Sequence, residues 1–100
     1  MSFTRKNLAQ QLSSRMSLPI EQATLTVDAT LEIMAEALVS GARMEFRNFG
    51  VIETIQRKPK IGRNSRNIKA GRYLIPSRKM VRFRVGKELF TRLNPEQHLR

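Results

Sequence analysis

The stretch of sequence that organises the chain is residues 43–57, RMEFRNFGVIETIQR. Up to Phe46, apolar residues occupy the even positions and charged residues the odd ones, which is the alternation of a half-buried strand. Residues 48–50 are Asn-Phe-Gly, which can form a turn, and residues 51–57 continue as a second run that is rich in branched aliphatic side chains. The stretch therefore predicts a β-hairpin.

The residues before this hairpin predict two helices. Thr4 has the position of an N-cap for a first helix of about ten residues. Pro19 suits the first turn of a longer second helix, and Gly41 provides its stop. Apolar residues lie on more than one side of this second helix, beyond what one small sheet would cover. A central core helix would explain the pattern, but a chain of 100 residues is marginal alone, so we favour packing against a second chain.

The residues after the hairpin change in character. Residues 58–74 contain only three aliphatic side chains larger than alanine, so this segment is either a disordered loop or a protruding hairpin arm. In residues 78–85 the odd positions from 81 onward are apolar, while Arg78, Arg82 and Arg84 share the opposite side of the expected strand. One face should pack, and the other should form a basic floor.

A short last helix is expected over residues 86–94, ending before Pro95. Its first-turn amides, together with Lys87, are placed to bind a phosphate. The tail, residues 95–100, should be frayed.

The positive charge is concentrated in the second half of the chain. The sequence holds 19 Lys and Arg against 8 Asp and Glu, a net charge of +11. Residues 1–50 are balanced, and no acid lies between Glu53 and Glu88, a stretch with twelve basic residues. A solvated surface normally mixes both signs. We therefore predict a polyanion-binding surface rather than a plain solvated face.

Composition excludes several classes of function. There is no Cys and only one His, His98, so disulfides, thiolate metal sites and histidine-based catalysis are excluded. The three acids of the basic half are not spaced as the carboxylate pair that a metal-dependent nuclease needs. There is no apolar run of bilayer length and no secretory signal. We expect a small, soluble, intracellular binding protein with no enzymatic activity, cofactor or metal.

Several motifs in order resemble the HU/integration host factor family of bacterial histone-like DNA-binding proteins. The resemblance covers about residues 3–94 and is specific because the pieces occur together at near-family spacing. They are residues 45–50 (EFRNFG), 57–64 (RKPKIGRN), 75–76 (IP), Lys79, Phe83 and 86–89 (GKEL).

The resemblance implies an α+β fold in an intertwined dimer, with a helical base and a three-stranded antiparallel sheet per chain that extends into a protruding β-arm. Residues 1–41 would form the helical dimerisation part, 42–57 and 74–85 the sheet, 58–73 the DNA-binding arm, 86–94 the C-terminal helix and 95–100 the tail. The implied dimer core comprises Val27, Leu31, Met34, Leu38, Phe46, Phe49 and Phe83.

The implied function is non-enzymatic binding of double-stranded DNA, by a homodimer or a heterodimer with a related subunit, in a cytoplasmic, nucleoid-associated protein. The basic arms would clasp the minor groove, where Arg63 fits the negative potential, and would package or bend DNA. The implied DNA-binding residues are Arg57, Lys58, Lys60, Arg63, Asn64, Ser65, Arg66, Lys69, Arg72, Lys79, Arg82, Arg84 and Lys87. An RNA-binding or ribosome-associated protein is the alternative for a small basic chain.

The arm tip departs from the family pattern. Ser65 stands where family members usually carry the Pro that wedges between base pairs, and the arm is about two residues longer. Ile68 is the one bulky apolar residue of the tip; it either packs against protein or acts as a substitute wedge. We expect weaker bending, because a serine side chain cannot fill an unstacked base step. Val85 replaces another frequent family Pro, a change we expect to be minor.

Overall fold

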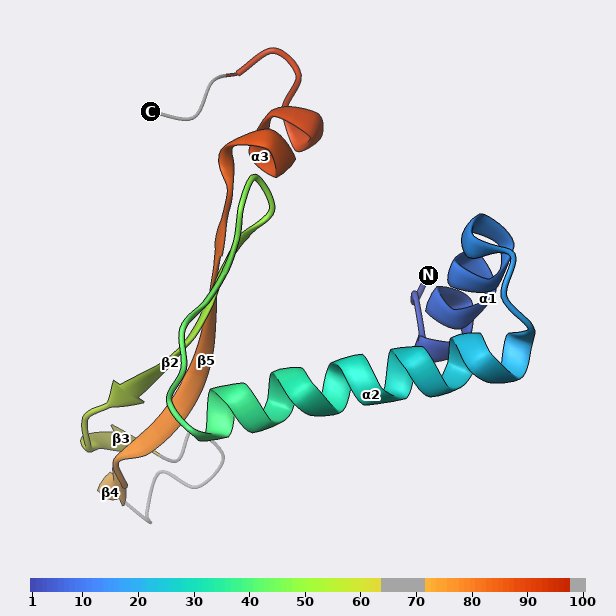
Figure 1. Ribbon diagram of the computed structural model, residues 1–100. Helices are drawn as coiled ribbons and strands as arrows, with labels where there is room; N and C mark the ends of the chain where they lie inside the picture. The colour runs from blue at the N-terminus through green and yellow to red at the C-terminus, as the bar shows by residue number, and fades with distance from the viewer. Residues whose placement is uncertain (64–71, 98–100) are drawn as a thin grey trace. The chain divides into compact units, whose positions relative to one another are not determined.

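The computed structural model describes residues 1–63 and 72–97, with side chains for 1–60 and 75–97 (Figure 1). The chain divides into two compact units, Met1–Ser40 and Gly41–Arg100. The first contains two helices, and the second contains the strands and a third helix. No helix in the described part of the chain combines the length and apolarity needed to cross a membrane.

The first unit pairs α1, Arg5–Met16, with α2, Ile20–Val39. Thr4 is the N-cap of α1, as expected, in a reciprocal capping box. The Asn7 amide donates to Thr4 Oγ1 at 3.3 Å, and the Thr4 amide donates to Asn7 Oδ1 at 2.9 Å. Two of the orphan donors of the first turn are thereby satisfied.

The first helix is longer than expected, with 12 residues rather than about ten. The serines near its end do not stop the helix. The Ser13 hydroxyl donates to the Leu18 carbonyl at 2.6 Å, so this hydrogen bond joins the last turn of the helix to the residues that follow it. The chain leaves α1 at Ser17, in a left-handed conformation with φ 54°. Pro19 precedes α2 as its N-cap instead of lying in its first turn.

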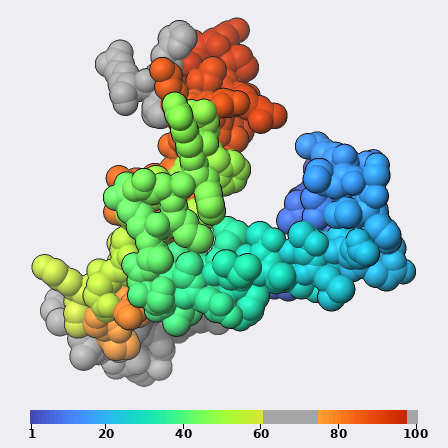
Figure 2. Space-filling view, in the orientation of Figure 1, coloured from blue at the N-terminus to red at the C-terminus, as the bar shows by residue number. Residues whose placement is uncertain are grey.

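A small apolar cluster joins the two helices. Its buried members are Ala9, Ala23 and Val27, and Leu12 and Leu31 pack against them half-buried. Two of the three buried residues are alanines, so little side-chain volume separates the helices at this contact. In the space-filling view α1 lies over the N-terminal part of α2 (Figure 2). Towards the other end of α2, Ile33 is 64% exposed and Val39 81%.

The second unit is built on the predicted hairpin. The strands β1, Met44–Phe46, and β2, Gly50–Arg57, are antiparallel, and β5, Arg78–Val85, pairs with the other edge of β2. Asn48 adopts a positive φ of 69° in the turn, a conformation that Asn tolerates better than most residues. The three-stranded antiparallel sheet expected from the sequence is therefore present, in the order β1-β2-β5.

The helix α3, Lys87–Leu93, is attached to the hairpin turn. The Gly86 amide donates to the Phe49 carbonyl at 2.8 Å, and the Leu89 amide donates to the Asn48 carbonyl at 3.1 Å. The turn thus accepts hydrogen bonds from the start of α3.

The arm forms an antiparallel ladder of its own, between β3, Lys60–Arg63, and β4, Arg72–Ile75. Of the two expectations for this segment, its described part agrees with the hairpin arm. The sequence assigned residues 74–85 to the main sheet. In the structure Leu74 and Ile75 belong to the arm, and the strand that pairs with β2 begins at Arg78.

The arm continues the β2–β5 ribbon without a change of register. Arg57 faces Arg78 at the end of one ladder, and Lys60 faces Ile75 at the start of the next. Counting inward from both pairs sets Pro59 opposite Pro76. Since proline has no N–H to donate, two facing prolines interrupt the hydrogen bonding at this point.

Side chains bridge this interruption. The Gln56 side-chain amide donates to the Ser77 hydroxyl, and that hydroxyl donates to the Arg57 carbonyl at 3.0 Å. The junction between the sheet and the arm is therefore joined through Ser77 where the backbone ladder is broken.

Candidate nucleic-acid interface

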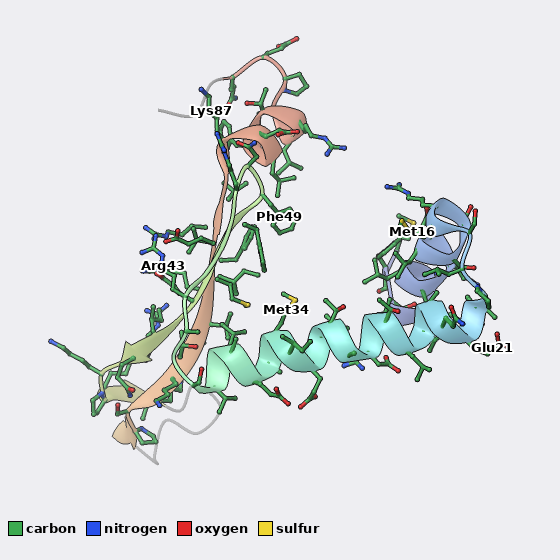
Figure 3. The ribbon with its side chains drawn as sticks, viewed as in Figure 1. Met16, Glu21, Met34, Arg43, Phe49 and Lys87 are labelled. Carbon is green, nitrogen blue, oxygen red and sulfur yellow. The ribbon has the colours of Figure 1, made fainter. Side chains whose placement is uncertain are left out.

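The sheet has two chemically different faces, because residues that face each other across an antiparallel ladder project to the same side. One face, called the basic face below, carries the cross-strand pairs Arg57–Arg78, Ile55–Met80, Glu53–Arg82 and Val51–Arg84. The other, called the apolar face, carries the pairs Ile52–Phe83 and Thr54–Val81, together with Phe46. The predicted separation of Arg78, Arg82 and Arg84 from the apolar residues at the odd positions 81, 83 and 85 is thus observed, while Met80 shares the basic face. Arg43 and Phe49 project to opposite sides of the sheet in Figure 3.

Aromatic side chains on the apolar face remain open to solvent. Phe49 and Phe83 meet edge to face, with ring centroids 5.7 Å apart and an interplanar angle of 60°. Phe46 is nevertheless 43% exposed, Phe83 45% and Val81 59%. An apolar surface of this kind is typical of a protein–protein contact.

An acidic residue lies in the middle of the basic face. Glu53 faces Arg82 on β5, and Arg82 donates to Glu53 Oε1 from Nε at 3.1 Å and also from Nη2. Glu53 Oε2 lies 3.8 Å from Arg84 Nη2 and 3.8 Å from Arg43 Nε. Only 13% of the Glu53 side chain is exposed, against about half of each arginine side chain. The guanidinium groups therefore cover the carboxylate.

The arginines keep this carboxylate ionised. The hydrogen bonding from Arg82, and then the positive charges of Arg82, Arg84 and Arg43, hold the pKa of Glu53 below its ordinary value, although removal from water acts in the opposite direction. Glu45 also pairs with Arg43, at 2.9 Å. These three arginines and two glutamates carry a net charge of +1, so this part of the face is less positive than its arginines alone indicate.

The positive charge is less compensated where the sheet meets the arm. Arg57, Lys58, Lys60, Arg78 and Met80 line one surface hollow there. Arg57 and Arg78 are direct cross-strand neighbours, an arrangement that is destabilising for two like charges. A polyanion bound in the hollow would reduce this repulsion. The phosphate groups of a nucleic acid suit this role, because the planar guanidinium group can bind a phosphate through two hydrogen bonds.

Two predicted residues have surroundings that differ from the rest. Lys79 faces Gln56 in the ladder, so it projects to the opposite side of the sheet from Arg78 and Arg82. Lys87 begins α3, but the Leu89 amide of that first turn is already used by the Asn48 carbonyl. This leaves a smaller amide site for phosphate than the sequence indicated.

The arm residues are described only in part. The backbones of Arg63 and Arg72 face each other in the β3–β4 ladder, and their side chains are outside the described set. Outside the described residues altogether lie Asn64, Ser65, Arg66, Lys69 and the candidate wedge Ile68.

Most of the residues expected in a dimer core are only partly covered in the single chain. Val27 is buried, at 3% exposure, and the other α2 members, Leu31, Met34 and Leu38, are half-buried. The three phenylalanines of the set lie on or beside the apolar face, where Phe49 is 50% exposed. Among the described residues, no group of His, Cys, Asp or Glu is arranged to hold a metal ion.

Sequence reasoning missed the roles of Arg43 and Glu53. The signal was present in the hairpin: the β1–β2 register of Met44 with Ile52, extended by one position, sets Arg43 opposite Glu53. The neighbour of Glu53 on its other side depends on the β2–β5 register, which a long intervening arm leaves open in sequence.

A sheet with one arginine-rich face that continues into a basic arm defines a class of small proteins that bind polyanions. Comparison with known proteins identifies the family. The family model described as "Bacterial DNA-binding protein" matches residues 3–94, and the chain belongs to this family, the HU/integration host factor family.

Individual relatives agree with this assignment. The probable DNA-binding protein HU of Chlamydia trachomatis serovar D is 36% identical over 88 residues, covering 88% of this chain and 87% of the relative. Integration host factor subunit beta of Cupriavidus metallidurans is 35% identical over 93 residues, covering 92% of this chain and 67% of the relative. The Anabaena HU–DNA cocrystal structure matches with a TM-score of 0.83 at 27% identity, covering 92% of this chain and 98% of that one.

Proposed function

We propose that this protein binds double-stranded DNA as a dimer, without catalysing a reaction, and that its basic arms clasp the minor groove. The observation that carries the proposal is the gathering of Arg57, Arg78, Arg82 and Arg84 on one face of a sheet whose ribbon continues in register into the arm. The match to an HU–DNA cocrystal structure over 92% of the chain supports it.

The dimer is supported by surface that one chain leaves uncovered. Only Ala9, Ala23 and Val27 are buried apolar residues in the described part of the chain, while Leu25 and Ile33 of α2 are 69% and 64% exposed. A domain with so little core gains its stability from a partner. The partner is a second copy of the chain or a related subunit, since one of the relatives is named as a subunit.

The arm supplies the groove contact. Lys58 and Lys60 line the basic hollow where the arm begins, and Arg63 is the last residue of β3. Charge at the base of the arm holds the phosphates on either side of the groove, and a planar guanidinium further along enters the groove, where the potential is negative. Asn64, Ser65, Arg66 and Lys69 would complete the contact.

The role in the cell would be packaging of nucleoid DNA or architectural bending, with a weak bend. Ser65 lacks the ring that fills an unstacked step in family members with Pro at this position, so the duplex is held chiefly by charge. Compaction would then result from coating or bridging of DNA.

The experiment is a comparison of duplex DNA, duplex RNA and single strands of matched length at one salt concentration, with the mass of the purified protein measured in parallel. We expect a dimer mass and the tightest binding to duplex DNA. Tighter binding to either form of RNA would overturn the DNA assignment, and a monomer mass at binding concentrations would overturn the dimer.

A further inference from the structure

The pairing of Arg82 with Glu53 affects how the basic face can meet DNA. Arg82 directs two N–H groups, Nε and Nη2, to the single oxygen Oε1 of Glu53. A carboxylate and a phosphate are alternative acceptors for the same fork of donors. The Glu53 side chain therefore occupies the donors that would otherwise bind a phosphate oxygen.

The neighbouring arginine is held differently. Arg84 Nη2 lies 3.8 Å from Glu53 Oε2, beyond hydrogen-bonding distance, and its side chain is 52% exposed. Arg82 and Arg84 are next but one on the same strand and share the basic face. Arg82 is thus hydrogen-bonded to Glu53, whereas its neighbour Arg84 is held only by a longer charge–charge contact.

We infer that Glu53 is an internal competitor for DNA phosphate, which withholds Arg82 and so limits the affinity of the basic face for duplex DNA. This rests on the proposed DNA-binding function and names a residue that regulates the same surface. For Arg82 to bind phosphate, its two bonds to Oε1 must break, and the Glu53 carboxylate, on a side chain that is only 13% exposed while paired, is left beside the phosphate chain. The like charges then oppose the contact.

The chain offers a matched control. Glu45 faces Val51 in the β1–β2 ladder and therefore lies on the same side of the sheet as Glu53. It pairs with Arg43 and is 66% exposed. Glu45→Gln and Glu53→Gln remove the same charge from the same face, but only Glu53→Gln removes the charged acceptor that holds Arg82.

The binding test measures affinity for one random-sequence duplex over a range of salt concentrations, using the parent dimer, E45Q, E53Q and the double variant E53Q/R82A. We expect E53Q to show a steeper plot of log affinity against log salt than E45Q, by about 0.9 for one added phosphate contact. The affinity of E53Q relative to that of E45Q should then rise roughly eightfold for each tenfold fall in salt concentration, and this difference should disappear in E53Q/R82A. Equal slopes for E53Q and E45Q, or weaker binding by E53Q, would overturn the inference.

A second measurement needs neither DNA nor a variant. Hydrogen exchange of the arginine Nε–H groups in the free parent protein, followed by nuclear magnetic resonance, should be slower for Arg82 than for Arg84. Equal exchange rates would contradict the withholding of Arg82. If Arg82 exchanged slowly but the protein did not bind duplex DNA, the Arg82–Glu53 pair would be confirmed and the proposed function would be overturned. Failure of this inference and failure of the proposed function are therefore distinguishable.

Discussion

Gly50 lies against the ring of Phe83, so closely that a Cβ built on the glycine would be 2.6 Å from Phe83 Cε1. The same Cβ would be 2.6 Å from the Arg84 carbonyl oxygen. Gly50 begins β2 and is buried, so the backbones of β2 and β5 and an aromatic ring meet where no side chain fits.

Gly50→Ala should therefore destabilise the protein, by about 1–3 kcal/mol, the usual cost of overpacking. Denaturant unfolding of the parent, Gly50→Ala, Phe83→Leu and the double variant measures this. Because leucine removes the ring atoms that the new methyl meets, the double variant should lose less stability than the sum of the single losses. Strict additivity would show that the ring is not what excludes the Cβ.

Removing charge from the arm should weaken binding to all duplex sequences. Arg63→Ala and Lys60→Ala should each flatten the plot of log affinity against log salt by about 0.9 if each side chain contacts one phosphate. The control is Arg15→Ala in the last turn of α1, far along the sequence from the arm, which should leave the slope unchanged. An unchanged affinity and slope after removal of both Arg63 and Lys60 would contradict the clasping arm.

Leu31→Asp should abolish folding and dimerisation together. Leu31 is half-buried against the cluster of Ala9, Ala23 and Val27, and an unpaired carboxylate in apolar surroundings costs several kcal/mol. Circular dichroism and sedimentation over a range of protein concentrations follow the two properties, with the exposed neighbour change Glu32→Gln as control. A folded monomer of Leu31→Asp would show that the core is not shared between chains.

The bend angle should depend on Ser65. Ser65→Pro supplies the ring that fills an unstacked base step, at roughly a few kcal/mol of unstacking repaid by a longer contact, so it should increase the bend. Ile68→Ala should leave the angle nearly unchanged. Energy transfer between the ends of a short labelled duplex measures both variants. A sharp bend in the parent that is lost in Ile68→Ala would mean that Ile68 is the wedge.

Acid should remove a contribution of Glu53 to stability. Because its pKa is lower in the folded state than in the unfolded state, the unfolded state binds the proton more readily. The contribution is complete above the ordinary pKa of glutamate and is lost as the pH falls through the lowered value. The stability difference between the parent and Glu53→Gln should therefore shrink as the pH is lowered through this range, with Glu45→Gln as the comparison. If the stability difference stayed constant with pH, the ionised form of Glu53 would not be what stabilises the folded state.

Local signals in the sequence were sufficient for most elements. Thr4 with Asn7, Gly41 and the turn at Asn48 each act within a few residues, so their conformations could be predicted without knowledge of the fold. The end of α1 could not, because the hydroxyl of Ser13 either competes with the helix or closes it, depending on where the carbonyl of Leu18 lies.

The chemistry of the basic face depended on strand register, which is a tertiary property. Counting basic residues treated Arg82 and Lys79 as equivalent, whereas the pairing with β2 sends them to opposite sides of the sheet. The alternation along residues 78–85 already contained this distinction, since 79 is odd. To predict the contact of Arg82 with Glu53, one needs the register of β2 against β5. These strands are separated in sequence by the whole arm, and no short-range pattern sets their register.

The facing prolines have a consequence for how the arm can vary. Pro59 and Pro76 interrupt the ladder at one level, while Arg57–Arg78 and Lys60–Ile75 keep a common register. The arm can therefore change in length without a change in the hydrogen bonding of the sheet. Residues added in pairs, one to each strand, lengthen it without shifting a single cross-strand partner in the sheet. An odd insertion has to be absorbed as a bulge or in the turn. The reach of the arm can thus evolve independently of the sheet that carries it.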